Sequence, residues 1–223
     1  MQARFENLSK FPAEPAARRL AMVNARLQTQ LTAPASAEVP QVLSELADIE
    51  GVPARIDMLR LLSVSLPPRE LVWWACLAGH DLAGGGGAPA PLAAAEAWVK
   101  DPVDARREAA RVAMDAADPD DDTTFCALCA VMADGRLGTG ELAQYEAPPG
   151  AAENAALSMN LVALAALGCD MERGADYLLD RGLDIARGGD GRGVERPAPM
   201  ALAQAQQAAM ATAARAEGEG GAA

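Results

Sequence analysis

The feature that most constrains the fold is the segment ENAALSMNLVALAALG, residues 153–168. It is apolar on nearly every face of a helical wheel, whereas a helix at a protein surface carries one apolar stripe and one polar face. A helix of this kind is stable only when other elements surround it. The segment therefore predicts a central, buried helix inside a helical domain.

The rest of the chain supplies helices to surround it. Hydrophobic residues make up 51% of the 223 residues, but aromatic residues only 4%, so the core consists mostly of alanine, leucine, valine and methionine. Alanine and leucine favour helices, and the alternating β-branched runs that strands need are nearly absent. We expect an all-α fold with about 7–9 helices, either an irregular helical bundle or a HEAT-like stack of helix pairs.

Composition and the positions of helix-breaking residues divide the chain into three parts. Residues 1–35 are expected to be an N-terminal helical segment, because apolar residues recur at helical spacing in ARRLAMVNARLQTQL. Residues 36–187 are expected to form the helical core domain. Residues 188–223, rich in Gly, Ala, Gln and Glu, are predicted to be a flexible tail.

Charge and cysteine content restrict the function. The net charge of −12 argues against a nucleic-acid partner, because contact with phosphates needs a basic face. The N-terminus lacks the apolar core of a signal peptide, and the most apolar run is shorter than the roughly 20 residues that cross a bilayer. We therefore expect a cytoplasmic protein without membrane insertion, and its four cysteines are expected to be reduced thiols.

Two neighbouring tryptophans stand in RELVWWACLAGHDL, residues 69–82. On a helix, Trp73, Cys76, Leu77 and His80 form one stripe, and Trp74 is turned about 100° away from it. We interpret the stripe as core packing. Trp74 is then the residue expected to meet a neighbouring helix or a partner at the surface.

Two further regions are candidates for contact with a partner protein. One is an arginine-bearing surface made by Arg69, Arg106, Arg107 and Arg111, since tryptophan and arginine are enriched in the energetic centres of interfaces. The simpler interpretation of these arginines is ion pairing on helix surfaces. The other candidate is the long Gly- and Pro-punctuated loop of residues 134–152 with Tyr145, because long loops inside compact domains are often functional.

The cysteines offer an alternative chemistry. Cys76 and His80 are four residues apart, and Cys126 and Cys129 in FCALC are three apart, so together they have the composition of a zinc site. Both pairs lie in expected helix interiors, which favours simple packing. A thioredoxin-like interpretation of CALC lacks the preceding strand that such a motif needs.

Three segments together resemble a bacterial helical family of unknown function, known mainly from proteobacteria and sometimes from the neighbourhood of type VI secretion or forkhead-associated-domain genes. They are LPPRELVWWACLAG, AAAEAWVKDPVDARREAARVAMDAA and ADGRLGTGELAQYEAPPGAAENAALSMNLVALAALG, within roughly residues 38–187. The sequence departs from the family pattern at DGRLGTG, where a Ser-Gly-Gly-Ser-like turn is expected. The resemblance implies a fold class and a bacterial origin but no chemistry.

The leading hypothesis is a non-enzymatic cytoplasmic protein-binding module: an adaptor, accessory or cargo-handling component of a larger assembly, with a link to secretion suggested by the resemblance. No cofactor is expected. The alternative is a thiol or zinc-binding protein that uses Cys76, His80, Cys126 and Cys129. A small-molecule enzyme with a pocket under the long loop ranks last, because no nucleophile can be named for it.

Overall fold

The computed structural model describes residues 2–200. Within this range the chain forms nine α-helices, three short 3₁₀ turns and two isolated β-bridges, which confirms the all-α prediction. The α-helices are α1 (Ala16–Met22), α2 (Val39–Ala47), α3 (Val52–Ser63), α4 (Pro68–Ala83), α5 (Ala90–Lys100), α6 (Asp104–Asp115), α7 (Thr124–Met132), α8 (Ala151–Ala166) and α9 (Met171–Arg187). The 3₁₀ turns are η1 (Gln2–Phe5), η2 (Gly84–Gly86) and η3 (Gly140–Gln144).

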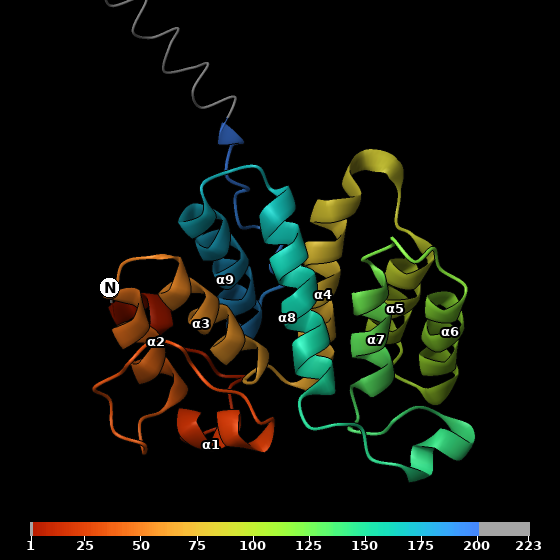
Figure 1. Ribbon diagram of the computed structural model, residues 1–223, viewed down its shortest axis with the longest axis horizontal. Coiled ribbons are helices and arrows are strands. Elements are labelled where there is room, and N and C mark those ends of the chain that lie inside the picture. The colour runs from red at the N-terminus through yellow and green to blue at the C-terminus, as the bar shows by residue number, and fades with distance from the viewer. Residues whose placement is uncertain (1, 201–223) are drawn as a thin grey trace, which may run out of the picture.

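Helices α4 and α8 form the centre of the molecule (Figure 1). Helix α8 packs against α4 and also contacts α3, α7 and α9. It corresponds to the apolar segment that predicted a buried central helix, and Ala156, Met159 and Ala163 along it are completely buried. The prediction of a central helix is therefore confirmed.

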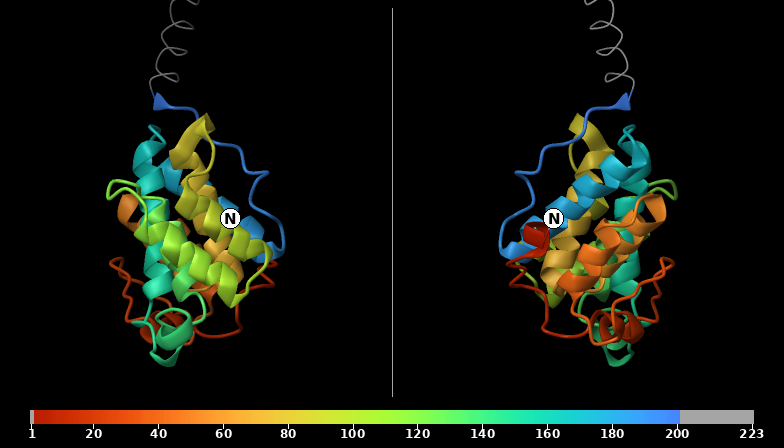
Figure 2. Two further views of the ribbon diagram at one scale, coloured as in Figure 1. Left: turned by 90° about the vertical axis from the view of Figure 1, so that its right-hand side faces the viewer. Right: turned by 90° about the vertical axis from the view of Figure 1, so that its left-hand side faces the viewer.

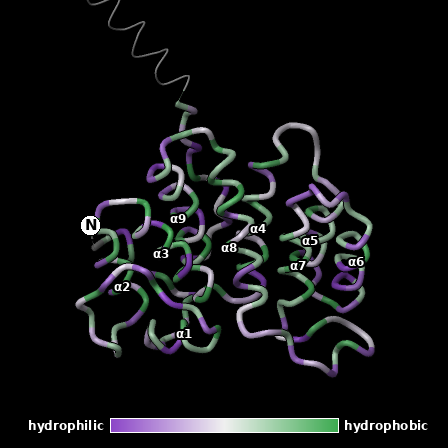
Figure 3. Tube along the Cα trace, in the orientation of Figure 1, coloured by the Kyte–Doolittle hydropathy of each residue, from purple (hydrophilic) through white to green (hydrophobic). Residues whose placement is uncertain are grey.

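The other helices lie on two flanks of this central pair. Helices α2, α3 and α9 are on one flank, and α5, α6 and α7 are on the other (Figure 1). Helix α7 is hydrophobic along most of its length, whereas α6 at the edge carries many hydrophilic residues (Figure 3). Because α9 packs on α3 and α8 packs on α4, elements distant in sequence are neighbours in space. The arrangement is an irregular bundle rather than a stack of sequential pairs.

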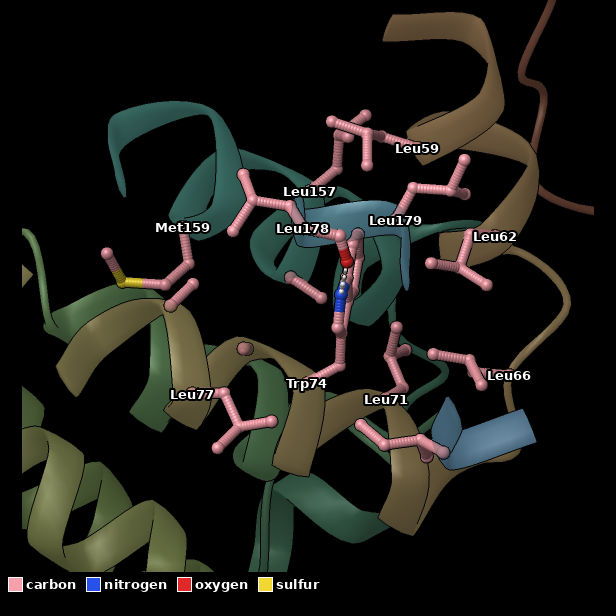
Figure 4. Packing of buried hydrophobic residues seen from close by; sticks show 14 of the residues in the cluster. Leu59, Leu62, Leu66, Leu71, Trp74, Leu77, Leu157, Met159, Leu178 and Leu179 are labelled. Atoms are coloured by element: carbon pink, nitrogen blue, oxygen red, sulfur yellow. Dashed lines mark hydrogen bonds between the residues drawn. The ribbon is translucent and has the colours of Figure 1, made fainter. Parts of the chain in front are cut away.

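Trp74 lies at the point where α4 meets α9. Its indole N–H donates a 2.9 Å hydrogen bond to the carbonyl of Leu178 (Figure 4), so a large apolar ring is buried with its one polar group satisfied. Gly182 allows α9 to approach α3 closely, since a Cβ there would overlap Cδ2 of Leu62 on α3 and lie 3.2 Å from Nε1 of Trp74. A side chain at this position would force Leu62 to shift.

The N-terminal part is less helical than predicted. Helix α1 ends at Met22, and Asn24 adopts a left-handed conformation with φ of 54°. The backbone N–H groups of Gln28 and Thr29 donate to the carboxylate of Asp57 at 2.8 and 2.7 Å. Because Asp57 is buried on α3, these bonds bind the segment to the core in an irregular path instead of a continued helix.

The predicted boundary of a flexible tail at residue 188 is also wrong. Residues 188–200, which we call the C-terminal strap, run along the outside of the molecule from the end of α9 (Figure 2). The N–H of Gly191 donates to the Asp184 carboxylate at 2.8 Å, and the N–H of Met200 donates to the carbonyl of Gly168 at 2.8 Å. The strap is therefore part of the folded body; the rest of the predicted tail, residues 201–223, lies outside the described residues.

Candidate functional site

A hollow of about 360 Å³ opens at the first turns of α4. We call it the Trp73 pocket. Five parts of the chain contribute to it: the N-terminal segment, α4, α5, α9 and the strap. Its lining residues are Lys10, Arg69, Glu70, Trp73, Glu96, Val99, Lys100, Ile185, Gly189, Asp190 and Arg192.

Trp73 is the aromatic side of this pocket. It is partly exposed, and its indole N–H donates a 2.7 Å hydrogen bond to the carbonyl of Asp190 in the strap. The guanidinium carbon of Arg192 lies 4.8 Å from the ring centroid, which is a cation–π distance. The strap therefore orients the indole and adds a cation beside it.

The structure corrects the predicted roles of the two tryptophans. Trp74 was the candidate for a partner contact, but it is only 1% exposed and meets the neighbouring helix α9, whereas Trp73, which was expected in the core, faces the pocket. Helix α4 contacts α5, α7, α8 and α9, so most of its circumference is covered. The signal for the open face was the polar residues on the turns around Trp73: Arg69 and Glu70 precede it by four and three positions, and His80 follows by seven.

The acidic residues of the pocket already have partners. Glu70 pairs with Lys10 (Oε1 to Nζ, 2.9 Å), and Glu96 lies 2.8 Å from Nε2 of His80. Most of the basic residues of the pocket have no ion-pair partner in the described part of the chain. The Nε of Arg69 donates to the carbonyl of Val99 at 2.7 Å, and within residues 2–200 neither Arg69, Lys100 nor Arg192 forms an ion pair.

A second hollow shares Lys10 with the Trp73 pocket. We call it the proline groove; its volume is about 540 Å³. It is mostly apolar, and its lining includes Phe11, Pro12, Met22, Val23, Leu66, Pro67, Pro68, Leu71, Met132, Pro148 and Pro149. Lys10 lines both hollows, and residues 67–73 contribute to both. The start of α4 therefore separates an apolar groove from a charged pocket.

The arginines predicted on α6 do not join this site. Arg107 is only 4% exposed, so its prediction as a surface residue is wrong: its guanidinium donates to the carbonyls of Val131 and Gly138 and pairs with Asp134. These acceptors satisfy the charge and fix the start of the long loop. Arg106 and Arg111 do form the surface ion pairs that were the simpler interpretation.

Glu108 connects α6 to the same loop. It accepts hydrogen bonds from Arg111 and from the hydroxyl of Thr139, at 2.6 Å, and these bonds lower its pKa to about 2. Backbone bonds between residues 135–137 and 145–147 close the loop on itself. Tyr145 is 56% exposed at its end. The loop is thus ordered, and a partner contact by Tyr145 stays a prediction.

The four residues of the alternative zinc site are not assembled. Cys76, Cys126 and Cys129 are all buried, whereas His80 is directed to Glu96. Within residues 2–200 no three His, Cys, Asp or Glu side chains are grouped to hold a metal ion. Burial, with the neighbouring Cys126 thiol as a second cause, raises the pKa of Cys76 well above its usual value, so this thiol is a poor nucleophile.

Fold and site together define an irregular all-α bundle with a charged, tryptophan-lined hollow at the start of its central helix. The chain belongs to a family of unknown function, DUF6931, whose model matches residues 42–186. No curated protein and no solved structure matches the chain. In the part of the chain that the structure describes, no helix is both long and apolar enough to span a membrane.

The family match includes one side of the Trp73 pocket and excludes the other. Arg69, Trp73 and Lys100 lie inside the matched residues. Lys10 and the strap residues lie outside them. The pocket is thus formed by the family domain and closed by the two flanking segments of this chain.

Proposed function

We propose that this chain is a non-enzymatic protein-binding module of the cytoplasm, an adaptor or accessory component of a larger assembly, and that its partner binds at the Trp73 pocket. The observation that carries the proposal is a partly exposed tryptophan beside an exposed arginine, Arg69, in a surface hollow. Tryptophan and arginine are enriched among the residues that dominate binding energy at interfaces. The four free thiols fit a reducing compartment.

The proline groove enlarges the surface available to a partner. It shares Lys10 with the Trp73 pocket, and the start of α4 lines both hollows, so a partner that covers both contacts Pro68 and Leu71 as well. An apolar region beside a polar one is the usual composition of a protein interface. The exposed Met22 in this groove adds a flexible apolar side chain that adapts to different shapes.

Affinity purification of the tagged full-length protein from its native cell, with mass spectrometry, tests the proposal. The comparison is between the wild type, Trp73→Ala and a matched aromatic control, Tyr145→Ala. We expect a stoichiometric partner that is retained by Tyr145→Ala and lost by Trp73→Ala, while the circular dichroism spectra of all three agree. A partner retained by Trp73→Ala, or no partner with any of the three proteins, would contradict the proposal.

A further inference from the structure

The distribution of charge around the Trp73 pocket indicates what kind of partner it fits. The protein as a whole is acidic, with a net charge of −12. Nevertheless three basic residues without an ion-pair partner among residues 2–200, Arg69, Lys100 and Arg192, line this one hollow. They come from α4, from the end of α5 and from the strap, so the fold brings them together from distant parts of the sequence.

Among the described residues, no carboxylate of the pocket lies within ion-pair distance of these three cations. Glu70 forms an ion pair with Lys10, and Glu96 Oε1 lies at hydrogen-bond distance, 2.8 Å, from Nε2 of His80. The carboxylate of Asp190 accepts the backbone N–H of Arg192 at 3.0 Å. Arg69 uses its Nε for the carbonyl of Val99, which leaves the two terminal nitrogens of its guanidinium for another acceptor.

The pocket also has an apolar part beside the charges. The Trp73 ring and Val99 line it, with Ile185 from α9 beneath. An occupant that satisfies both parts carries anionic groups next to an apolar side chain. Carboxylates in an extended or helical peptide have this composition, and arginine binds them through paired hydrogen bonds.

We propose that the Trp73 pocket binds an acidic segment of a protein partner, whose Asp or Glu carboxylates bind Arg69, Lys100 and Arg192 while an apolar side chain packs on Trp73. The proposal rests on the proposed protein-binding function and specifies the partner's chemistry. A protein segment fits better than a nucleic acid, because a long polyanion would extend beyond the three cations onto an acidic surface.

The test is a binding titration of the full-length protein with two synthetic probes that carry a fluorescein label. One is the peptide EELEELEE, and the other is its uncharged counterpart QQLQQLQQ. Fluorescence anisotropy reports the bound fraction. We expect saturable binding of the acidic peptide, at least tenfold tighter than that of the uncharged peptide, and roughly tenfold weaker binding when the salt concentration rises from about 0.05 to about 0.5 M.

Two charge reversals locate the binding. Lys100→Glu changes the pocket, whereas Arg173→Glu makes the same change of charge at an exposed arginine outside the pocket lining. We expect Lys100→Glu to weaken binding of the acidic peptide by roughly tenfold and Arg173→Glu by less than about twofold. Circular dichroism confirms that both variants fold.

Several results would overturn the inference. They are equal binding of the two peptides, no binding of either, and equal effects of the two charge reversals. Tighter binding of an oligothymidylate than of the acidic peptide would assign the cations to a nucleic acid instead. A partner that depends on Trp73 in the purification experiment, without acidic-peptide binding, would leave the proposed function in place and remove only the acidic specificity.

Discussion

Two basic regions of this molecule have similar composition and opposite environments. On α6, Arg107 and Arg111 each bind carboxylates of their own chain, and Arg107 also binds two backbone carbonyls. In the Trp73 pocket, Arg69 and Lys100 have no carboxylate partner among the described residues. Arginine content alone therefore does not identify a binding surface; the hydrogen-bonding capacity that each guanidinium leaves unsatisfied does.

The α6 region uses its charges for structure. Arg107 connects α6 to the end of α7 and to the loop that follows, and Glu108 connects the same loop through Thr139. In the Trp73 pocket, the Lys10–Glu70 pair joins the N-terminal segment to α4 and Arg69 binds the carbonyl of Val99, whereas Lys100 forms no ion pair among the described residues. If this comparison is right, substitutions on α6 change stability, and substitutions in the pocket change binding.

The largest effect is expected for Arg107→Met. The change removes a buried guanidinium and leaves the carbonyls of Val131 and Gly138 without their donor, at a cost of about 2–3 kcal/mol in the free energy of unfolding. Urea denaturation measures it. Arg106→Met, one position away and exposed, is the control and should change stability by less than about 0.5 kcal/mol. Equal effects of the two substitutions would show that the buried guanidinium of Arg107 is not a structural group.

A smaller effect is expected for Gly191→Ala in the strap. Gly191 has φ of +72°, and a Cβ there would lie 2.8 Å from Leu77 Cδ1, so alanine should destabilise the protein by about 1 kcal/mol and loosen the strap. Because Arg192 and Asp190 move with the strap, affinity for the acidic peptide should fall as well. Gly193→Ala is the control, since its Cβ meets nothing within 4 Å. Thermal unfolding and limited proteolysis compare them; identical behaviour would show that the strap is not held as described.

The stability that Glu108 contributes by connecting α6 to the loop should depend weakly on pH. Glu108 has its pKa lowered to about 2 in the folded protein by its bonds from Arg111 and Thr139. A depressed carboxylate pKa stabilises the fold above the unfolded value, near 4.5, and this contribution is lost as the pH falls towards 2. We expect Glu108→Gln to reduce the loss of stability over that range, measured as the urea midpoint at each pH. Parallel pH profiles for the variant and the wild type would refute this.

The smallest effect on stability is expected for Arg69→Met. Arg69 is exposed and binds one carbonyl, so the free energy of unfolding should change by no more than about 0.5 kcal/mol. Binding of the acidic peptide should nevertheless weaken severalfold. A loss of stability comparable to that of Arg107→Met would place Arg69 among the structural residues and remove the distinction between the two regions.

The core helix was the most predictable part of the structure, because the apolar pattern of residues 153–168 does not depend on which neighbours cover it. The orientation of Trp73 and Trp74 was not predictable in the same way. Helix α4 is covered by helices from both flanks, so the apolar stripe does not by itself show which face is open. The polar residues around Trp73 marked the open face, but Arg69 was assigned to a surface shared with the α6 arginines and His80 to the core stripe.

The parts that failed were those whose partners are distant in sequence. The glycine-rich strap has the composition of a flexible tail, yet Asp184 binds the N–H of Gly191 and Trp73 binds the carbonyl of Asp190. Asp57 similarly takes two N–H groups from the segment after α1. In both cases buried or part-buried side chains satisfy irregular backbone, and no local pattern in the sequence indicates such bonds.

The position of α9 has a consequence for how the protein is made. Until residues 171–187 are synthesised, the indole N–H of Trp74 lacks its acceptor at Leu178, and Leu62 lacks the neighbouring backbone at Gly182. The backbone N–H of Lys10 likewise lacks its acceptor, the carbonyl of Ala186, until then. A chain emerges from the ribosome starting at its N-terminus, so the central helices stay partly uncovered until translation has passed α9. The packing of the domain is therefore completed late in synthesis.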